Sequence, residues 1–232
     1  MAIPMYTDGK YLARNPTWHV EDSTLKAQQI LAMIRRHGLT PQTICEVGSG
    51  AGEILVQLQN HLPESCRFSG YDISPHAHAI ALPRSNDCLE FHLGDLTNDP
   101  ESHFDLILLI DVIEHLEDYY GFLRRLKPFS AYKILHVPLD LSAYTVLRGH
   151  PILDQRESVG HIHYFTKDTA LAALRDTGYE IVDSFYTSGV HLLRGKPFRQ
   201  KLLAILRETL YKFVPDFAVR LLGGRSLLVL VR

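Results

Sequence analysis

Apolar and polar positions along the chain follow two periods that alternate over most of its length. Short apolar runs rich in β-branched and aromatic residues predict strands, and stretches with an apolar residue every three to four positions predict helices. The expected strands lie at 43–47, 68–71, 89–93, 105–110, 132–137, 179–186 and 225–231. Strands that alternate with helices favour an α/β fold in which helices cover a parallel sheet.

Helix boundaries have their own signals in the sequence. Asp22 or Ser23 is expected to cap the first long helix, because either side chain can accept hydrogen bonds from the N–H groups of a first turn. Thr166 is expected to cap a later helix that ends at Gly178, a residue suited to the backbone conformation that follows a helix. Between 139 and 165 the pattern is less regular, and no element is predicted there.

The length of 232 residues favours a single domain, 1–232, with two additions. A helical insertion at about 188–223 is expected to cover the sheet edge or the substrate. A segment at about 1–22 is expected to form a lid over cofactor or acceptor, with ordinary surface packing as an equal alternative. The residues behind these expectations are Tyr6, Tyr11, Asn15, Trp18 and His19 in the lid and Leu202, Leu203, Leu206 and Leu210 in the insertion.

Composition narrows the class of protein. With 46% apolar and 22% charged residues, the chain matches ordinary globular proteins, and no apolar run reaches the length of a membrane span. The first residues lack a basic start followed by an apolar stretch, so a cytoplasmic location is expected. Cys45, Cys66 and Cys88 are scattered and odd in number, which indicates reduced packing residues.

Charge is unevenly distributed although the net charge is only −2. Residues 191–232 contain nine Lys or Arg against two Asp or Glu. A solvated face is the ordinary explanation, and peripheral membrane contact by this region is the alternative that stays open. The first two thirds of the chain has no basic stripe interleaved with aromatic residues, so no nucleic-acid partner is expected. The sequence does not determine the oligomeric state.

A glycine-rich turn follows the first expected strand and leads into a helix. Its glycines, Gly48, Gly50 and Gly52, permit positive φ angles and the close approach of a ligand, although such a turn can also serve geometry alone. Asp72 follows the second strand, where a carboxylate can accept both hydroxyls of an adenosine ribose. Asp95 ends the third strand, where it can reach an adenine edge.

These residues resemble the motifs of class I S-adenosylmethionine (SAM)-dependent methyltransferases. The family's first motif, an acidic residue followed by GxGxG, is matched by Glu46-Val47-Gly48-Ser49-Gly50-Ala51-Gly52. The second and third motifs are matched by Tyr71-Asp72-Ile73-Ser74 and by Gly94-Asp95-Leu96. The resemblance implies that Asp72 binds the ribose and Asp95 contacts the adenine.

Two later segments resemble one subgroup, which includes the ubiquinone-biosynthesis O-methyltransferases. They are Asp111-Val112-Ile113-Glu114-His115-Leu116 and Gly160-His161-Ile162-His163-Tyr164-Phe165-Thr166. The chain departs from the family where Phe129-Ser130 replaces the Gly-Gly that often follows Leu-Lys-Pro, which puts the geometry of that turn in doubt.

The resemblance implies a Rossmann-like, seven-stranded, mostly parallel sheet with helices on both faces and an antiparallel last strand. It also implies SAM as cofactor, S-adenosylhomocysteine (SAH) as product, and methyl transfer to a small-molecule acceptor at oxygen or nitrogen rather than carbon. The implied cofactor-binding residues are Glu46, Gly48, Ser49, Gly50, Gly52, Asp72, Ile73, Asp95, Leu96 and Asp111.

Two alternatives to a methyltransferase stay open. An NAD-dependent oxidoreductase would need a small residue where Glu53 stands, and its carboxylate would face a pyrophosphate. SAM has no phosphate there and carries a sulfonium cation, so SAM is favoured. A module that binds SAM without transferring the methyl group, or that uses the scaffold for another reaction, is the second alternative.

Three histidines are candidates for the chemistry. Methyl transfer depends mainly on holding the acceptor in line with the methyl carbon, and a histidine titrating near neutrality can take the acceptor's proton. His115 follows the fourth strand, whereas His161 and His163 alternate in an extended segment and are expected to point the same way. The plainer interpretations are that His115 only positions the cofactor and that the other two serve structural hydrogen bonds.

A metal site at residues 111–115 is a further alternative. Asp111, Glu114 and His115 fall at i, i+3 and i+4, so a helical turn would bring them onto one face, and such ligands suit a divalent cation. Many similar methyltransferases have this string without a metal, so no metal is expected.

Overall fold

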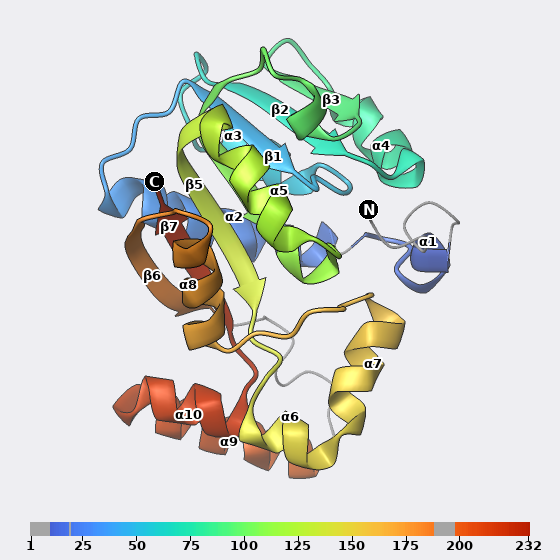
Figure 1. Ribbon diagram of the computed structural model, residues 1–232. Helices are drawn as coiled ribbons and strands as arrows, with labels where there is room; N and C mark the ends of the chain where they lie inside the picture. The colour runs from blue at the N-terminus through green and yellow to red at the C-terminus, as the bar shows by residue number, and fades with distance from the viewer. Residues whose placement is uncertain (1–9, 19, 188–197) are drawn as a thin grey trace.

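The computed structural model describes residues 10–18, 20–187 and 198–232, with residues 10, 198–204 and 206 described in backbone alone. Its strands are β1 (Thr43–Val47), β2 (Arg67–Asp72), β3 (Leu89–Leu93), β4 (Phe104–Ile110), β5 (Ser130–Pro138), β6 (Ile181–Thr187) and β7 (Ser226–Val231). They form one sheet in the order β3-β2-β1-β4-β5-β7-β6 (Figure 1). The first five strands are parallel, and β7 is antiparallel to both β5 and β6. The predicted fold class is confirmed.

Helices cover both faces of the sheet because successive strand residues point to opposite sides. In β1, Cys45 and Val47 pack into the core under α5 (Tyr119–Leu126) and α8 (Lys167–Asp176). Ile44 packs on the other face, where the core includes residues of α2 (Val20–Arg36), α3 (Glu53–Gln59) and α4 (Pro75–Ala81). The chain order reverses beside β1, which has β2 on one side and β4 on the other, so a crevice is expected at their carboxyl ends.

The helix signals were only partly right. Thr166 caps α8 as predicted, since its side chain accepts from the backbone N–H of Thr169. The prediction for α2 was wrong: the helix begins at Val20, so Asp22 lies in its first turn. There the carboxylate still meets the positive end of the helix dipole. Three helices were not predicted, namely α1 (Lys10–Arg14), α6 (Ala143–Arg148) and α7 (His150–Ser158).

The insertion between β6 and β7 contains α9 (Phe198–Phe213) and α10 (Pro215–Leu222). Together with α6 it lies beyond the carboxyl end of β5 (Figure 1). The Arg207 guanidinium joins them, because it donates to the Leu222 carbonyl and lies over the Tyr144 ring. Residues 188–197 and the side chains of Leu202, Leu203 and Leu206 lie outside the described part.

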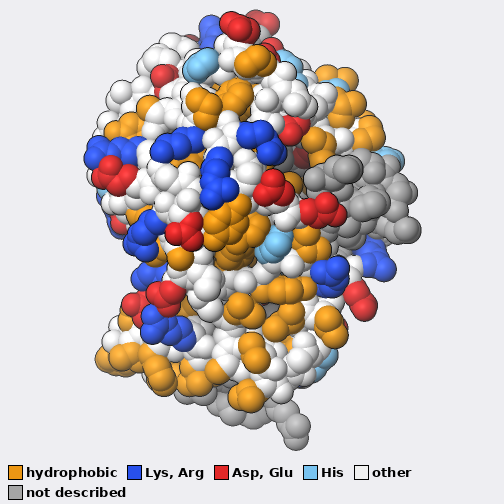
Figure 2. Space-filling view, viewed as in Figure 1, with side chains coloured by type: hydrophobic (Ala, Val, Ile, Leu, Met, Phe, Trp, Pro, Cys, Tyr) orange, Lys and Arg blue, Asp and Glu red, His pale blue; other side chains and the backbone are white. Residues whose placement is uncertain are grey.

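Large apolar side chains are exposed on α6, α7, α9 and α10, and Figure 2 shows hydrophobic side chains gathered over the lower part of the molecule. They include Val146, Leu147, Leu153, Phe213 and Phe217. Within the described ranges, no helix is long and apolar enough to cross a membrane. Membrane contact by the basic C-terminal region stays a prediction.

Candidate functional site

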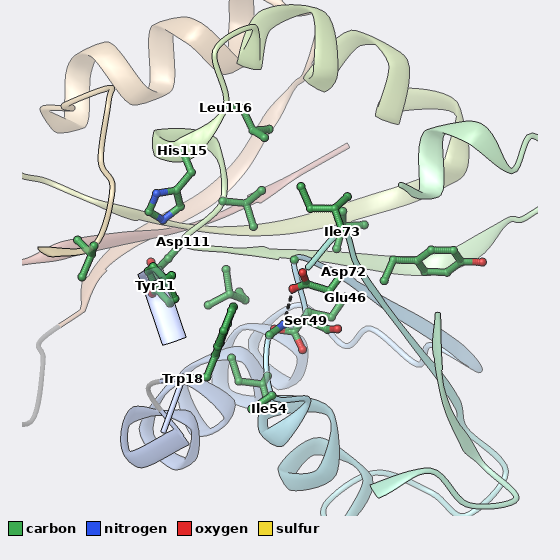
Figure 3. Close-up of a pocket in the computed structure, with 18 of the residues that line it drawn as sticks. Tyr11, Trp18, Glu46, Ser49, Ile54, Asp72, Ile73, Asp111, His115 and Leu116 are labelled. Atoms are coloured by element: carbon green, nitrogen blue, oxygen red, sulfur yellow. Dashed lines mark hydrogen bonds between the residues drawn. The ribbon is translucent and has the colours of Figure 1, made fainter. Parts of the chain in front are cut away.

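A cavity of about 610 Å³ lies at the carboxyl ends of β1, β2 and β4, where the strand order reverses. Its volume is that of a small-molecule pocket. Most of the predicted site residues line it: Glu46, Gly48, Ser49, Gly50, Asp72, Ile73, Asp95, Asp111, His115 and His161. Figure 3 shows Glu46, Ser49 and Asp72 close together and His115 at the other end, beside Asp111. Gly52, Leu96 and His163 are not among the lining residues.

The glycines of the turn have different tasks. All three have positive φ angles, 75° at Gly48, 55° at Gly50 and 79° at Gly52. A Cβ atom at Gly50 would lie 2.7 Å from the Trp18 ring, across the mouth of the turn. A Cβ atom at Gly52 would instead overlap the Phe91 ring beneath the turn. Gly50 therefore borders the cavity, whereas Gly52 allows the turn to pack on the sheet.

Asp72 ends β2 and holds the turn in place. Its Oδ2 accepts from the Gly50 N–H and its Oδ1 from the Ser74 N–H, both at 2.8 Å. Burial raises the pKa of Asp72, and these hydrogen bonds oppose that rise. Each carboxylate oxygen has two lone pairs, so the group can still accept hydrogen bonds from a ligand in the cavity.

Glu46 is a fully buried carboxylate beside that turn, with 1% of its surface exposed. Its Oε2 atom has no hydrogen-bond partner among the described residues. Burial raises the pKa of Glu46 well above its usual range, although the nearby Lys26 ammonium opposes the rise. A buried acceptor without a partner is costly in a folded protein, so this oxygen is available to a cationic or N–H ligand group.

Asp111 lines the cavity but is already engaged by Lys26 and His136. Lys26 Nζ lies 2.7 Å from one carboxylate oxygen, and His136 Nδ1 contacts the other. The Nε2 atom of His136 lies 2.8 Å from the Thr187 hydroxyl. Burial alone would raise the pKa of Asp111, but His136 and Lys26 hold it far below the usual range. Sequence reasoning missed both partners, although a histidine within the apolar strand β5 was a possible signal.

Asp95 and Leu96 follow β3 and differ in accessibility. Asp95 accepts hydrogen bonds from the backbone N–H and the hydroxyl of Thr97, and it lines the cavity. Leu96 is fully buried in the core beside Phe122. A side-chain contact between Leu96 and a ligand in the cavity is therefore not supported.

His115 and His161 both line the cavity, and Figure 3 shows His115 at the end away from Asp72. The Nδ1 atom of His115 lies 3.1 Å from the Gly160 carbonyl, and that of His161 lies 2.6 Å from an Asp140 carboxylate oxygen. Their rings meet edge to face, with centroids 4.9 Å apart. Burial, together with His161, lowers the pKa of His115 to about 4, so its imidazole is neutral near pH 7.

The expectation that the side chains of His161 and His163 point the same way is wrong, because only one of them reaches the cavity. His163 Nε2 lies 2.9 Å from the Leu116 carbonyl, and its ring packs against Tyr119. Only His161 of the pair lines the cavity. Residues 160–165 are not in a strand, so strict alternation of side chains does not apply to them.

Glu114 is the third member of this group. Its side chain is fully buried, and neither carboxylate oxygen has a hydrogen-bond partner among the described residues. Oε1 lies 3.8 Å from His115 Nε2 and 4.0 Å from His161 Nε2. Burial raises the pKa of Glu114, and Asp111 adds to the rise. These three residues offer one ligand atom each within 4.8 Å of one another, an arrangement that can hold a metal ion.

The N-terminal segment lies over the cavity and contacts α7. Trp18 and Tyr11 line the cavity, with ring centroids 4.8 Å apart. Arg14 donates to the Glu157 carbonyl, and the Asn15 side chain donates to the Ser158 carbonyl. The lid function stays a prediction, and Tyr6 and His19 lie outside the described residues.

A family model matches this chain, and known structures share its fold. The family model of a methyltransferase domain matches residues 20–184. Magnesium protoporphyrin IX methyltransferase from Synechocystis, solved with SAH, is 16% identical at a TM-score of 0.60, covering 90% of this chain and 82% of that one. The N-methyltransferase NodS from Bradyrhizobium japonicum, also solved with SAH, is 17% identical at a TM-score of 0.57. The match covers 89% of this chain and 85% of NodS.

The fold also occurs in a protein with a different reaction. The [4+2]-cyclase SpnF is 14% identical at a TM-score of 0.60, covering 89% of this chain and 80% of that one. No curated protein sequence is significantly similar to this chain. The narrower likeness to the ubiquinone-biosynthesis subgroup stays a prediction. Because the family match spans well over half of the chain and agrees with its motifs, the chain belongs to the class I SAM-dependent methyltransferases.

Proposed function

We propose that this protein transfers a methyl group from SAM to a small-molecule acceptor, at oxygen or nitrogen rather than carbon. The observation that supports this most directly is the unpartnered Oε2 of Glu46, which lines the same cavity as Asp72. An ammonium group, such as that of the methionine part of SAM, satisfies a buried carboxylate by a charge-assisted hydrogen bond. Asp72 then receives the ribose hydroxyls, and Asp95 the adenine edge.

The charge of the cavity also favours SAM over NAD. Seven of its lining residues are acidic, namely Asp22, Glu46, Glu53, Asp72, Asp95, Asp111 and Asp118, whereas only Lys26 and Arg125 are basic. Such a lining attracts a sulfonium cation and repels a pyrophosphate. The charge of the cavity therefore does not favour an NAD-dependent oxidoreductase.

The residues contribute to transfer mainly by position. SAM supplies a methyl carbon activated by the sulfonium. Trp18 and Tyr11 line the cavity and would help to hold the acceptor in line with that carbon, which favours its attack. A hydroxyl acceptor loses its proton as the new bond forms and the carbon–sulfur bond breaks, whereas an ammonium acceptor must lose a proton before it can attack. The neutral imidazole of His115, at the end of the cavity away from Asp72, is placed to receive it.

Mass spectrometry of the native protein tests the cofactor, since it would detect co-purified SAM or SAH. Calorimetry then compares SAH with NADH, and tighter binding of NADH would overturn the proposal. Incubation with SAM and a metabolite mixture tests transfer by the gain of one methyl group. Tight SAH binding without any methylated product would favour the alternative of a SAM-binding module or another reaction, as the cyclase on this fold illustrates.

A further inference from the structure

The hydroxyl of Tyr11 reports on the charge of the cavity near the place where an acceptor is expected. Tyr11 lines the cavity and is 7% exposed, and Figure 3 shows it beside Asp111. Burial, followed by the Asp111 carboxylate, raises the pKa of this phenol. An acceptor hydroxyl beside Tyr11 would meet the same surroundings, which oppose the negative charge that develops on an oxygen as its proton leaves.

Methylation of an amine changes the charge of the reacting atoms in a different way. The lone pair of a neutral amine attacks the methyl carbon, the carbon–sulfur bond breaks, and its electron pair stays on the sulfur. The positive charge moves from the sulfonium to the nitrogen, and no proton moves in this step. With a hydroxyl, the positive charge leaves with the proton. A cavity lined mainly by carboxylates stabilises a cation throughout transfer to an amine, so it is complementary to that transition state.

The basic residues of the lining already face carboxylates. In the described part of the chain, Lys26 and Arg125 are the Lys and Arg residues that line the cavity. Lys26 Nζ lies 2.7 Å from an oxygen of Asp111, and Arg125 Nη1 lies 4.0 Å from an oxygen of Asp118. A carboxylate or phosphate on the acceptor would therefore lie among like charges, which disfavours an anionic acceptor.

Two aromatic rings offer a site for the cation that transfer to an amine produces. The Tyr11 and Trp18 rings line the cavity with centroids 4.8 Å apart and planes tilted by 57°. A cation within about 6 Å of the centroid of such a ring is attracted by its π electrons, and aromatic rings are the usual recognition element for quaternary ammonium groups. Such rings discriminate a methylated ammonium from a neutral group of the same shape.

We propose that the acceptor is an amine without an acidic group near its nitrogen, and that Tyr11 and Trp18 hold the methylated ammonium product. Tyr11 is then a residue that determines specificity for nitrogen over oxygen. This inference rests on the proposed methyl transfer and narrows it to N-methylation.

A matched pair of probes tests the ammonium site without turnover. Choline and 3,3-dimethylbutan-1-ol have the same shape, but the second has a neutral carbon in place of the cationic nitrogen. Calorimetry measures the affinity of each probe for the SAH-bound protein. We expect choline to bind about tenfold more tightly than the neutral alcohol, because only choline gains from the aromatic rings and the carboxylates.

Variants of Tyr11 test the contribution of its ring. Tyr11→Leu should reduce the preference for choline by about threefold or more, whereas Tyr11→Phe retains the ring and should keep the preference. Tyr120→Leu is the matched control, because Tyr120 is not among the lining residues, and it should bind both probes like the wild type. A Tyr11→Leu protein with the full preference would overturn the role of Tyr11. If Tyr11→Leu does not fold, as judged by circular dichroism, the comparison of the two probes on the wild type decides.

A transfer assay tests the methylated atom directly. The product formed from SAM and a metabolite mixture is fragmented in a mass spectrometer, and the added methyl group should lie on a nitrogen. Methylation at oxygen would overturn the amine acceptor.

The outcomes separate this inference from the proposed function. A protein that binds SAH but binds the two probes equally, or does not bind choline, would overturn the amine acceptor alone. A protein that does not bind SAH would overturn the proposed methyl transfer itself.

Discussion

Lys26 Nζ lies 2.7 Å from Asp111 Oδ2, although the two residues are 85 positions apart in the sequence. His136 contacts the other oxygen of the same carboxylate. This arrangement connects α2, the end of β4 and β5 directly beneath the cavity. The Asp111 carboxylate therefore stabilises the fold in addition to lining the cavity.

Asp111→Asn should lower the free energy of unfolding at pH 7 by about 3 kcal/mol, because it leaves the Lys26 ammonium without its counter-charge and His136 without its carboxylate partner. Asparagine tolerates the positive φ of 56° at this position, so the change mainly removes charge. The depressed pKa of Asp111 means that its contribution is complete above the unfolded value near 4 and is lost as the pH falls below it.

Urea unfolding at pH 7 and at pH 3 checks this prediction. The difference in free energy of unfolding between the wild type and Asp111→Asn should be smaller at pH 3 than at pH 7. An equal difference at the two pH values would contradict the prediction. Asp168→Asn is the control, because its ion pair with Arg220 is exposed and contributes little.

Trp18 is the single tryptophan of the chain and packs over Gly50 at the cavity. A ligand at the turn should change the surroundings of its indole ring. We therefore expect SAH to change the intrinsic tryptophan fluorescence in a saturable manner, with a midpoint that agrees with calorimetry. Trp18→Phe should abolish the signal. A saturating signal from NADH at lower concentration would point to another cofactor.

Gly50→Val should abolish SAH binding in a folded protein. The added side chain would overlap the Trp18 ring and resist the φ of 55°. Gly38→Val separates strain from obstruction, since Gly38 has a similar φ of 59° but open space around it. This control should lose stability and keep its SAH affinity. Normal affinity in Gly50→Val would mean that the turn is only structural.

Asp72→Ala should weaken SAH binding by roughly tenfold or more, because it removes charge-assisted hydrogen bonds to the ribose. It also removes the acceptor of the Gly50 N–H, so some of the loss reflects a looser turn. Asp72→Asn retains that acceptor and should lose less affinity. Calorimetry with SAH compares the three proteins, and unchanged affinity in both variants would exclude Asp72 from the ribose site.

His115→Ala and His161→Ala should reduce turnover by about 10²–10⁴-fold while changing SAH affinity little, because both side chains lie at the acceptor end. His163→Ala should retain most activity, since its ring contacts Tyr119 outside the cavity. Steady-state kinetics on the acceptor found by metabolite screening measures these effects. Wild-type turnover in both His115→Ala and His161→Ala would mean that neither histidine takes part, and that catalysis depends only on holding donor and acceptor together.

The sequence predicted the parts of the fold that have local signals. β1 was predicted at the bounds it has, because the apolar residues Ile44, Cys45 and Val47 are followed directly by the glycine-rich turn. By contrast, α6 and α7 were missed because they are short and have no apolar stripe facing a core: Leu147 and Leu153 are exposed. Their stability comes from tertiary contacts such as the one between Arg207 and Tyr144.

The candidate site was predictable to a similar degree. Gly48, Gly50 and Asp72 lie at strand ends that any parallel sheet brings together, so their placement followed from the fold class. The partners of Asp111 depend on side chains from two distant elements, which no local pattern encodes. The same holds for His161 with Asp140 and for the convergence of His161 with Glu114.

The contact of Arg14 and Asn15 with α7 has a kinetic consequence. Trp18 lies against Gly50 of the glycine turn, and Gln155 and Val159, at the end of α7, line the same cavity. Because hydrogen bonds join these two segments, displacing one breaks contacts of the other. Donor and acceptor would then enter through one shared opening. We expect an ordered sequence in which SAM binds first and SAH leaves last.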